Sequence, residues 1–517
     1  MLFRSIIGSG AGGGTLARSL VESGVKVLVL ERGDWLPREP QNWDPVEVFQ
    51  RERYVSADVW FDGQGRPFQP GSHYVVGGAT KMYGAAHFRL RERDFEAVAH
   101  VDGISPAWPI RYADLEPYYA RAESWYHVHG LAGEDPIEPF RSSPFPYPPI
   151  AHEPRIQRLA DDLRAAGLRP FHAPTGVDLT ESDPAFSACL KCNRCDGYPC
   201  LVHAKGDAEV MGIRPALSQP DSSLTLLTRA EVRRLETDAS GRAVSRVVVQ
   251  RDGEELRFSG DLVVVSCGAA NSARLLLMSA NDHHPRGLAN SSDQVGRNYM
   301  YHQCQALVAL AHEPNATVFQ KTLAINDWYF GDEAFPFPMG QIQMTGKTNG
   351  AMMKGYKPLL TALAPGWSMD RIADHALDFW LQTEDLPLAE NRVTVTPEGQ
   401  ITLHYTPTNV AASRELRSRL ESLLDRLYLQ QHLAERQVYF GSPMGLAAVA
   451  HQAGTCRFGD DPSTSVLDPM CKAHDLDNLY VVDTSFFPSI GAVNPSLTAI
   501  ANALRVGDHM RERLASG

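Results

Sequence analysis

Closely spaced glycines near the start of the chain, followed by an acidic residue, have the types and spacing to bind a dinucleotide. Gly8 permits a tight turn, Gly10 lets the backbone approach a pyrophosphate, and Gly13 lets a helix pack closely on a strand. The helix that follows turns its N-terminus toward the anion. Glu31 lies about 20 residues further on, where a carboxylate accepts a ribose hydroxyl. An acid at this place favours FAD or NAD over NADP.

Four cysteines form a second group with possible chemistry, at Cys189, Cys192, Cys195 and Cys200. Thiolates at such spacing can converge on a soft metal or a cluster. The spacing departs from the ferredoxin run, because Pro199 stands before the last cysteine and not after it. An iron–sulfur cluster, a zinc site, and thiols or disulfides that pack a loop all stay open, and the packing role is favoured. No metal site is therefore assigned.

Most histidines carry a weaker signal. The pairs His127/His129 and His283/His284 have the local spacing of metal ligands but no third ligand nearby, so we interpret them as surface or packing residues. A single histidine such as His451 more often makes a structural hydrogen bond than acts in catalysis. Its role therefore depends on what surrounds it.

The predicted elements place the glycines at one edge of a sheet. An apolar run over 2–7, a helical pattern over 15–21 and a buried strand over 25–31 form a strand, glycine turn, helix and strand. A second step of this kind runs from the strand 262–265 through Gly268 to a helix over 273–278. Residues 238–241 indicate the tip of a hairpin between strands at 224–227 and 243–249.

The region 303–445 predicts a second domain with a mixed sheet, since 341–344 and 392–395 have strand-like patterns. The segment 346–374 is rich in Met, Gly and Pro, and we expect an irregular loop over the mouth of a substrate site.

Composition excludes several classes of protein. The 517 residues exceed one comfortable core, so two or more joined domains are expected. The net charge of −12 opposes nucleic acid or an anionic membrane as partner. No apolar stretch reaches the ~20 residues of a membrane-spanning helix, and the first strand leaves no room for a signal peptide. We expect a cytoplasmic protein; its oligomeric state is left open.

Several further motifs resemble those of the glucose-methanol-choline (GMC) flavin oxidoreductases. These are the paired glycines in 74–84, Trp108-Pro109-Ile110, the run 114–119, and the C-terminal runs 451–457, 479–485 and 494–498. The runs 80–86 and 88–91 look most similar to the bacterial pyranose-oxidase and C-glycoside 3-oxidase branch.

The resemblance implies that the dinucleotide is FAD. Fungal pyranose oxidases bind the flavin covalently through a histidine in the paired-glycine segment. This chain has Met82 at the matching place and His87 out of register, so non-covalent FAD is expected. The resemblance implies this set of cofactor-binding residues: Gly8, Gly10, Ala11, Gly13, Glu31, Arg32, Gly77, Gly78, Thr80, Tyr83, Val232, Gly268, Asp483 and Pro495.

His451 and Asn494 stand where the family keeps its catalytic pair, although Gln452 replaces the usual proline after the histidine. Oxidation of an alcohol needs hydride delivery to flavin N5 while a base removes the hydroxyl proton, and imidazole suits that transfer. Asn494 can donate an amide N–H to the developing alkoxide. Pro495 begins a helix whose positive end can face the flavin pyrimidine.

The predicted fold is α/β: a Rossmann-type FAD domain in discontinuous pieces and an α+β substrate domain with a mixed sheet, in a GMC/p-hydroxybenzoate-hydroxylase-like architecture. The predicted segments are 1–95, 221–302 and 446–517 for the FAD domain, 96–220 for a lid with the cysteines, and 303–445 for the substrate domain.

The predicted function is oxidation of a secondary ring hydroxyl, at C2 or C3, of a pyranose or glycoside to a ketone, with oxygen or another electron acceptor. One alternative is a dehydrogenase that passes electrons through a cluster at Cys189–Cys200. Another is a flavin-binding protein without catalysis, which the two filled catalytic positions oppose.

Overall fold

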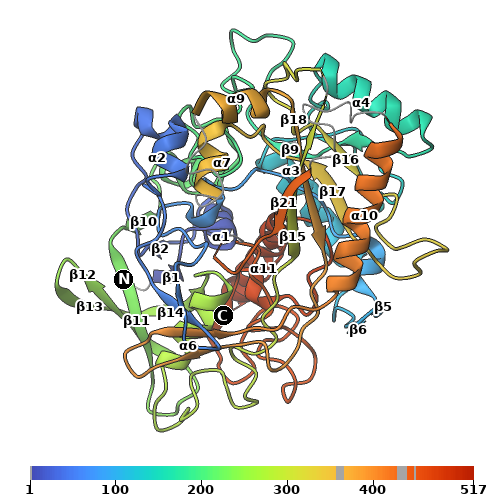
Figure 1. The fold of residues 1–517 in the computed structure, drawn as a ribbon. Coiled ribbons are helices and arrows are strands. Elements are labelled where there is room, and N and C mark those ends of the chain that lie inside the picture. The colour runs from blue at the N-terminus through green and yellow to red at the C-terminus, as the bar shows by residue number, and fades with distance from the viewer. Residues whose placement is uncertain (1–2, 312, 357–365, 428–438, 448–449, 517) are drawn as a thin grey trace.

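Five strands pair in parallel to form the sheet that carries the glycine turn (Figure 1). The structure is a computed structural model, and it describes residues 3–311, 313–356, 366–427, 439–447 and 450–516. In spatial order the strands are β10 (Leu224–Leu227), β2 (Val27–Leu30), β1 (Phe3–Ile7), β14 (Gly260–Val265) and β22 (Leu479–Val481). Three stretches of chain far apart in sequence therefore build one sheet. The residue bounds of the five predicted segments stay a prediction.

Three helices beside this sheet pack one against the next. The helix α1 (Ala11–Val21) contacts α11 (Ser496–Ser516), which contacts α3 (Tyr112–Trp125). The hydroxyls of Tyr119 in α3 and Thr498 in α11 lie 2.7 Å apart in a buried hydrogen bond. The helix α6 (Ala269–Met278) follows the second glycine turn. Helix α11 begins at Ser496, one residue after the predicted start at Pro495.

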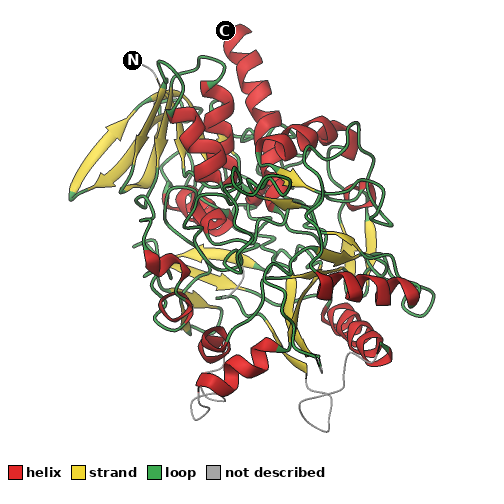
Figure 2. Cartoon of the chain, turned by 90° about the horizontal axis from the view of Figure 1, so that it is seen from above, coloured by secondary structure: helices red, strands yellow, loops and turns green. Residues whose placement is uncertain are grey.

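The predicted hairpin tip at 238–241 exists, but its first strand differs from the prediction. The tip joins β11 (Ala230–Thr237) to β12 (Val244–Arg251), which continues into β13 (Glu254–Phe258). Residues 224–227 instead form β10 at the edge of the parallel sheet, where their backbone pairs in parallel with that of β2. The three-stranded sheet stands to one side of the molecule in both views (Figures 1 and 2).

The second large sheet has six strands, all of whose described pairings are antiparallel. Its strands, in spatial order, are β21 (Tyr439–Pro443), β15 (Gln303–Leu310), β18 (Ala376–Thr383), β17 (Gln341–Met344), β16 (Leu323–Ile325) and β8 (Phe171–His172). The predicted strand 392–395 belongs to another, mixed sheet of four strands. These are β19 (Arg392–Val395), β20 (Ile401–His404), β3 (Trp60–Asp62) and β4 (Pro67–Phe68).

The two faces of the six-stranded sheet differ in character. Leu381 and Ile342 pair across one face, where they belong to a cluster that includes Leu420 of α10 (Val410–Arg426) and Leu159 of α4 (Pro154–Ala165). Figure 1 shows these two helices along that side of the sheet. The opposite face carries glutamines of β17 and β18. This alternation arises because successive side chains of a strand point to opposite faces.

The segment predicted as an irregular loop over 346–374 is partly helical, and residues 357–365 lie outside the described residues. Its described parts form α7 (Gly350–Tyr356) and α9 (Gly366–Asp374), which contact each other. Helix α7 also contacts α2 (Pro45–Phe49), and Gln50 Nε2 donates to the Ala351 carbonyl at 3.2 Å. Methionine and a single glycine are tolerated in helices, so composition alone misled the prediction.

Short elements complete the described chain. They are η1 (Pro40–Trp43), η2 (Gly78–Lys81), η3 (Glu92–Phe95), β5 (Val98–His100), β6 (Gly103–Ser105), β7 (Val128–His129), β9 (Thr175–Gly176), η4 (Glu209–Ile213), α5 (Arg214–Leu217) and η5 (Thr484–Phe486). Among the helices that the structure describes, none has both the length and the apolar character required to span a membrane.

Candidate active site

The glycine turn between β1 and α1 is packed so tightly that side chains would collide at several of its positions, and a Cβ at Gly12 would lie 1.9 Å from the Val482 carbonyl oxygen. A Cβ at Gly8 would lie 2.2 Å from the Ser266 carbonyl oxygen, and Gly8 has a φ of +99°. A Cβ at Gly13 would lie 2.2 Å from the Gly8 carbonyl oxygen. A Cβ at Gly10 would meet nothing within 4 Å. The turn therefore uses Gly8 and Gly13 for packing and leaves open space beside Gly10, as a pyrophosphate requires.

Glu31 follows β2 and joins two glycine-containing segments through Ser9. Its Oε2 accepts from the backbone N of Ser9 at 3.0 Å and from its Oγ at 2.6 Å, and Oε1 accepts from the Gly33 N at 2.9 Å. The Ser9 Oγ in turn accepts from the Gly77 N at 3.0 Å. Burial raises the pKa of Glu31, against the hydrogen bonds from Ser9 and Gly33. The carboxylate is thus held in place at the sheet edge where a ribose hydroxyl would reach it.

The paired glycines lie directly opposite the glycine turn. Gly77 and Gly78 have φ values of +93° and +56°, which glycine adopts without strain. A Cβ at Gly78 would lie 3.2 Å from the Cα of Gly10. The Thr80 Oγ donates to the Gly77 carbonyl at 2.6 Å and fixes the turn. The Tyr83 hydroxyl donates to the Gly206 carbonyl, and it lies 3.1 Å from His87 Nε2.

A buried lysine fastens the cysteine-bearing loop to this segment. Lys205 Nζ lies 2.7–3.0 Å from four backbone carbonyls, at Lys81, Tyr83, Cys195 and Tyr198. Lys205 is 1% exposed, and burial lowers its pKa. The four carbonyl dipoles compensate part of the cost of burying the ammonium group.

We expect Lys205→Met to lower the free energy of unfolding by about 3 kcal/mol or more, because buried carbonyls would lose their donor. Urea denaturation followed by flavin fluorescence measures the change. The matched control Lys191→Met, in the same loop, removes a half-buried ion pair with Glu181 and should cost less than about 1 kcal/mol. Equal losses in the two variants would contradict this role of Lys205.

The cysteines of that loop contribute to a small apolar cluster. Cys189, Cys195 and Cys200 pack there with neighbours that include Val177 and Phe319. All eight cysteines of the chain, Cys192 included, are free thiols in the structure. Burial raises the pKa of Cys189 to about 11 and that of Cys195 to about 12. Over the described ranges, no three His, Cys, Asp or Glu side chains are placed to hold a metal ion. The choice among thiols, disulfides and a metal centre stays a prediction.

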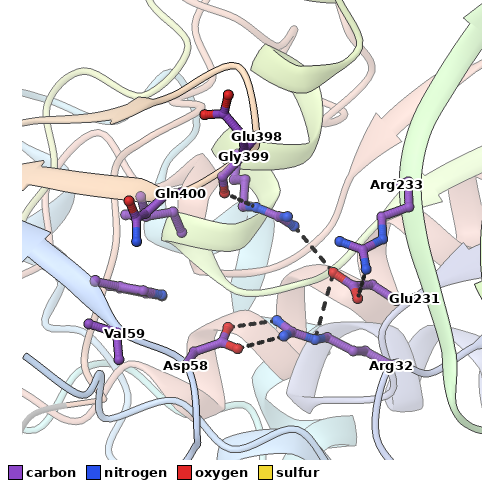
Figure 3. A pocket seen from close by; sticks show the side chains of 11 residues that line it. Arg32, Asp58, Val59, Glu231, Arg233, Glu398, Gly399 and Gln400 are labelled. Carbon is purple, nitrogen blue, oxygen red and sulfur yellow. Dashed lines mark hydrogen bonds and ion pairs between the residues drawn. The ribbon is translucent and has the colours of Figure 1, made fainter.

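A pocket of about 260 Å³ opens beside Arg32 and Glu231 (Figure 3). Arg32 donates to both oxygens of Asp58, at 2.8 and 2.6 Å, and lies 3.8 Å from the Glu231 carboxylate. Arg274 approaches the same carboxylate at 3.6 Å. Val232, the next residue of β11, is 7% exposed. Arg32, which belongs to the predicted cofactor-binding set, and Glu231, which precedes Val232 of that set, line the pocket, so it is a candidate site for part of the dinucleotide.

Asp483 links the end of β22 to the second glycine turn. Its Oδ2 accepts from the Gly268 N at 2.9 Å and from Ser272 Oγ at 2.5 Å, and its Oδ1 accepts from the Ser485 N at 2.8 Å. Asp483 thereby caps η5 and binds the start of α6. Its role in cofactor binding stays a prediction, and its capping role is evident in the structure.

A second histidine contacts His451 and determines which nitrogen carries its proton. His302 Nε2 lies 3.0 Å from the Gly491 carbonyl, which can only accept, so this nitrogen carries a proton. Neutral His302 then accepts at Nδ1, which lies 3.0 Å from His451 Nδ1. His451 must donate from Nδ1, and its Nε2 keeps a lone pair. This tautomer is the one that a general base needs.

Burial lowers the pKa of His451 to about 4, and it lowers that of His302 well below the usual range, with His451 adding to the effect. Only neutral imidazole accepts a proton, so His451 is the active base above this pKa. We expect kcat/KM to stay level as the pH falls through 6.5 and to decline only near pH 4. Anaerobic flavin reduction across this range measures the profile. An acid limb at pH 6.5 would contradict the assignment.

Asn494 precedes α11 and is held by two glutamines of the six-stranded sheet. Its Oδ1 accepts from Gln343 Nε2 at 3.1 Å and from Gln382 Nε2 at 3.2 Å. The amide therefore keeps Nδ2 as its donor. His302 reaches the carbonyl of Gly491, three residues before Asn494, so the histidines and the amide lie in one region of the fold.

Comparison with known proteins identifies the family of the chain. The N-terminal model of the GMC oxidoreductases matches residues 11–304, and the C-terminal model matches residues 387–503. The chain belongs to the GMC oxidoreductase family. It is 31% identical to the 6'''-hydroxyparomomycin C oxidase of Streptomyces lividus, with 99% of this chain and 91% of that protein covered. It is 29% identical to the paromamine 6'-oxidase of Streptomyces fradiae, with 97% and 89% covered.

The fold agrees with that of a solved member of this class. The crystal structure titled pyridoxine 4-oxidase from Mesorbium loti aligns with a TM-score of 0.68, at 19% identity and with 99% of each chain covered. The predicted α/β fold and GMC architecture are confirmed. The protein is an FAD-dependent oxidoreductase that acts on CH–OH groups, as the sequence predicted.

The residues around the two glycine segments fit FAD. The open space at Gly10, the positive φ of Gly77 and Gly78, and the fixed carboxylate of Glu31 form a cradle for a dinucleotide. The N-terminus of α1, which begins at Ala11, points its amides toward the same turn.

We expect this GMC oxidoreductase to release its FAD on acid denaturation. Met82 cannot form the histidyl bond, and His87 is fully buried with its Nε2 at the Tyr83 hydroxyl. Trichloroacetic acid precipitation should therefore leave a colourless pellet and a yellow supernatant. Flavin that stays with the pellet would contradict the prediction.

Sequence reasoning missed three residues of this site. The sequence alone predicts no role for His302, Gln343 or Gln382 in the site. Gln343 lies in the alternating run 341–344, which places it on one face of a strand, whereas residues 379–381 before Gln382 are all apolar and give no such signal. The signal for His302 was absent, because its partner lies 149 residues away in the sequence.

Proposed function

We propose that this GMC oxidoreductase oxidises a secondary ring hydroxyl, at C2 or C3, of a pyranose or glycoside to the ketone. The proposal is supported by the free Nε2 of His451 and the amide donor of Asn494, on segments that His302 connects through its contacts with His451 and with the Gly491 carbonyl. Two curated relatives over nearly the whole chain have names that describe oxidases of aminoglycoside sugars. These names support a carbohydrate substrate.

In this proposal, His451 Nε2 accepts the hydroxyl proton of the substrate. The Asn494 Nδ2 donates to the same oxygen as negative charge develops on it, which stabilises the alkoxide without competing for the proton. The carbinol carbon loses hydride as the C=O bond forms, and bound FAD supplies the acceptor. The glutamine contacts hold the amide, and the His302 contact holds the imidazole, so little reorganisation is needed.

A second candidate is oxidation at C6, which in a pyranose is a primary alcohol and would yield an aldehyde. The position 6' in the name of the Streptomyces fradiae relative favours it. The net charge of −12 would also attract cationic amino sugars.

Anaerobic titration of the purified holoenzyme with glucose, methyl glucoside, an aryl C-glucoside and paromamine tests both candidates. Bleaching of the oxidised flavin band by a sugar supports the substrate class. Product NMR then distinguishes a ring ketone from a C6 aldehyde. A flavin that none of these compounds bleaches would overturn the substrate assignment and leave the family intact.

The electron acceptor is proposed to be oxygen or another electron acceptor. Reoxidation of the reduced flavin in air, compared with reoxidation by a quinone or a dye, separates an oxidase from a dehydrogenase.

A further inference from the structure

A continuous chain of side-chain hydrogen bonds connects an acidic residue outside the six-stranded sheet to Asn494. Asp135 Oδ2 accepts from Asn326 Nδ2 at 3.0 Å, and Asn326 Oδ1 accepts from Gln341 Nε2 at 3.3 Å. Gln341 Oε1 accepts from Gln382 Nε2 at 3.0 Å, and the same Nε2 donates to Asn494 Oδ1 at 3.2 Å. The three amides between the two ends are at most 1% exposed.

Asp135, the first residue of this hydrogen-bond chain, can only accept a hydrogen bond from Asn326. Asp135 forms a buried ion pair with Arg91, whose guanidinium donates to the same carboxylate oxygen. A carboxylate paired with arginine accepts and does not donate. Asn326 must therefore turn its Nδ2 toward Asp135 and its Oδ1 toward Gln341.

The orientation of each amide in turn determines which end of the next amide donates and which end accepts. The oxygen and nitrogen ends of a side-chain amide have almost the same shape, so hydrogen-bond partners determine which end points where. Reversal of Gln341 would put two oxygens together at Asn326. Reversal of Asn494 would place its NH2 against the NH2 groups of Gln382 and Gln343.

We propose that Asp135, Asn326, Gln341 and Gln382 are positioning residues that set the orientation of the Asn494 amide. Their chain turns Oδ1 of Asn494 into the protein and leaves Nδ2 to donate to the substrate oxygen. This inference rests on the proposed function for the role of the donor, but the orientation itself can be tested separately.

Two glutamate substitutions at neighbouring links distinguish this role from a general effect of buried charge. In Gln341→Glu, the new carboxylic acid donates its OH to Asn326 and accepts from Gln382, so the sense of the chain is kept. In Gln382→Glu, the ionised group accepts only and faces the oxygens of both Gln341 and Asn494. Asn494 then reverses, the amide of Gln343 turns with it so that its oxygen accepts from Asn494, and Asn494 presents Oδ1 to the substrate.

We expect Gln382→Glu to lower the rate constant of flavin reduction about a hundredfold at high pH, the cost of losing one donor to a developing oxyanion. The loss should shrink as the pH falls, because the protonated acid donates again to Asn494. Gln341→Glu should stay within about threefold of the unsubstituted protein at every pH. Equal losses in both variants, or a loss in Gln382→Glu that does not change with pH, would overturn the proposal.

The anchor is tested at Asn326. Asn326→Leu removes the hydrogen bonds that join Asp135 to Gln341, so the remaining amides can adopt either of two orientations. The rate constant of flavin reduction should then fall at least about twofold. In Asn326→Asp, a protonated carboxyl group donates its OH to Asp135 and accepts from Gln341 Nε2 through its other oxygen, so the rate should be retained. Loss in Asn326→Asp together with retention in Asn326→Leu would overturn the role of the anchor.

NMR of the FAD-loaded protein labelled with [¹⁵N]asparagine provides a readout without turnover. The Asn494 side-chain signal is assigned from its absence in Asn494→Asp. The amide protons should exchange rapidly in the unsubstituted protein and in Gln341→Glu, and they should become protected in Gln382→Glu as the pH rises. If no sugar reduces the flavin, the proposed function fails, and this measurement still decides the orientation. Unchanged exchange in Gln382→Glu would overturn the inference.

Discussion

Replacement of His451 by alanine is expected to lower the rate constant of flavin reduction by about a hundredfold or more, with FAD still bound. A positioned general base contributes roughly 10²–10⁴-fold to such a proton transfer. Alanine removes the only nitrogen that the hydrogen bond to His302 leaves free as an acceptor in this pair. FAD should stay because Gly8, Gly10 and Glu31, which belong to the predicted cofactor-binding set, are unchanged in this variant.

Anaerobic stopped-flow absorption with saturating sugar measures the rate of flavin reduction. The ratio of flavin absorbance to protein absorbance measures how much FAD is bound. The matched control is His283→Ala, which makes the same substitution at an exposed position and should leave both quantities unchanged. Undiminished reduction in His451→Ala would eliminate His451 as the base. Loss of the flavin would instead assign His451 a structural role.

The FAD half of the fold could be predicted because its determinants are local. Gly8, Gly10 and Gly13 lie within six residues, and Glu31 follows directly after the next strand. Such a unit forms by short-range packing, and a Cβ at Gly8 or Gly13 would lie only 2.2 Å from a backbone oxygen. The sequence therefore carried enough information for the turn, the helix and the parallel strands.

The orientation of the catalytic pair could not be predicted, because it depends on contacts between distant parts of the chain. His302 meets His451 across 149 residues, and Gln382 meets Asn494 across 112. No periodic pattern marks such a partner. The alternation in 341–344 indicates a polar face of β17, but only the fold shows that Gln343, together with Gln382 of β18, contacts Asn494.

The contacts of the buried Lys205, which stabilise the fold, could not be predicted from the sequence either. In the sequence it is an ordinary lysine after a cysteine-rich run, and its four carbonyl partners belong to two segments more than 100 residues apart. Its effect is to hold the cysteine loop against the paired glycines. The cysteines drew attention in the sequence, whereas the contact that positions their loop comes from the lysine.

Asn494→Asp is expected to lower the rate constant of flavin reduction by about 10²–10³-fold while leaving the surrounding contacts in place. One carboxylate oxygen can still accept from Gln343 and Gln382, so the side chain keeps its position. The other oxygen replaces the N–H donor and repels the developing alkoxide. The change thus reverses the electrostatics at the substrate oxygen with almost no change in volume.

Asn494→His is the matched variant, because neutral imidazole, like the amide, carries an N–H donor and no negative charge. An imidazole N–H can donate to the alkoxide, so this variant should retain more activity than Asn494→Asp, measured again by anaerobic flavin reduction. Equal loss in the two variants would mean that the shape of the asparagine matters and not its donor. Greater retention in Asn494→Asp would refute the donor role, and with it the reason for the amide chain to fix Nδ2 toward the substrate.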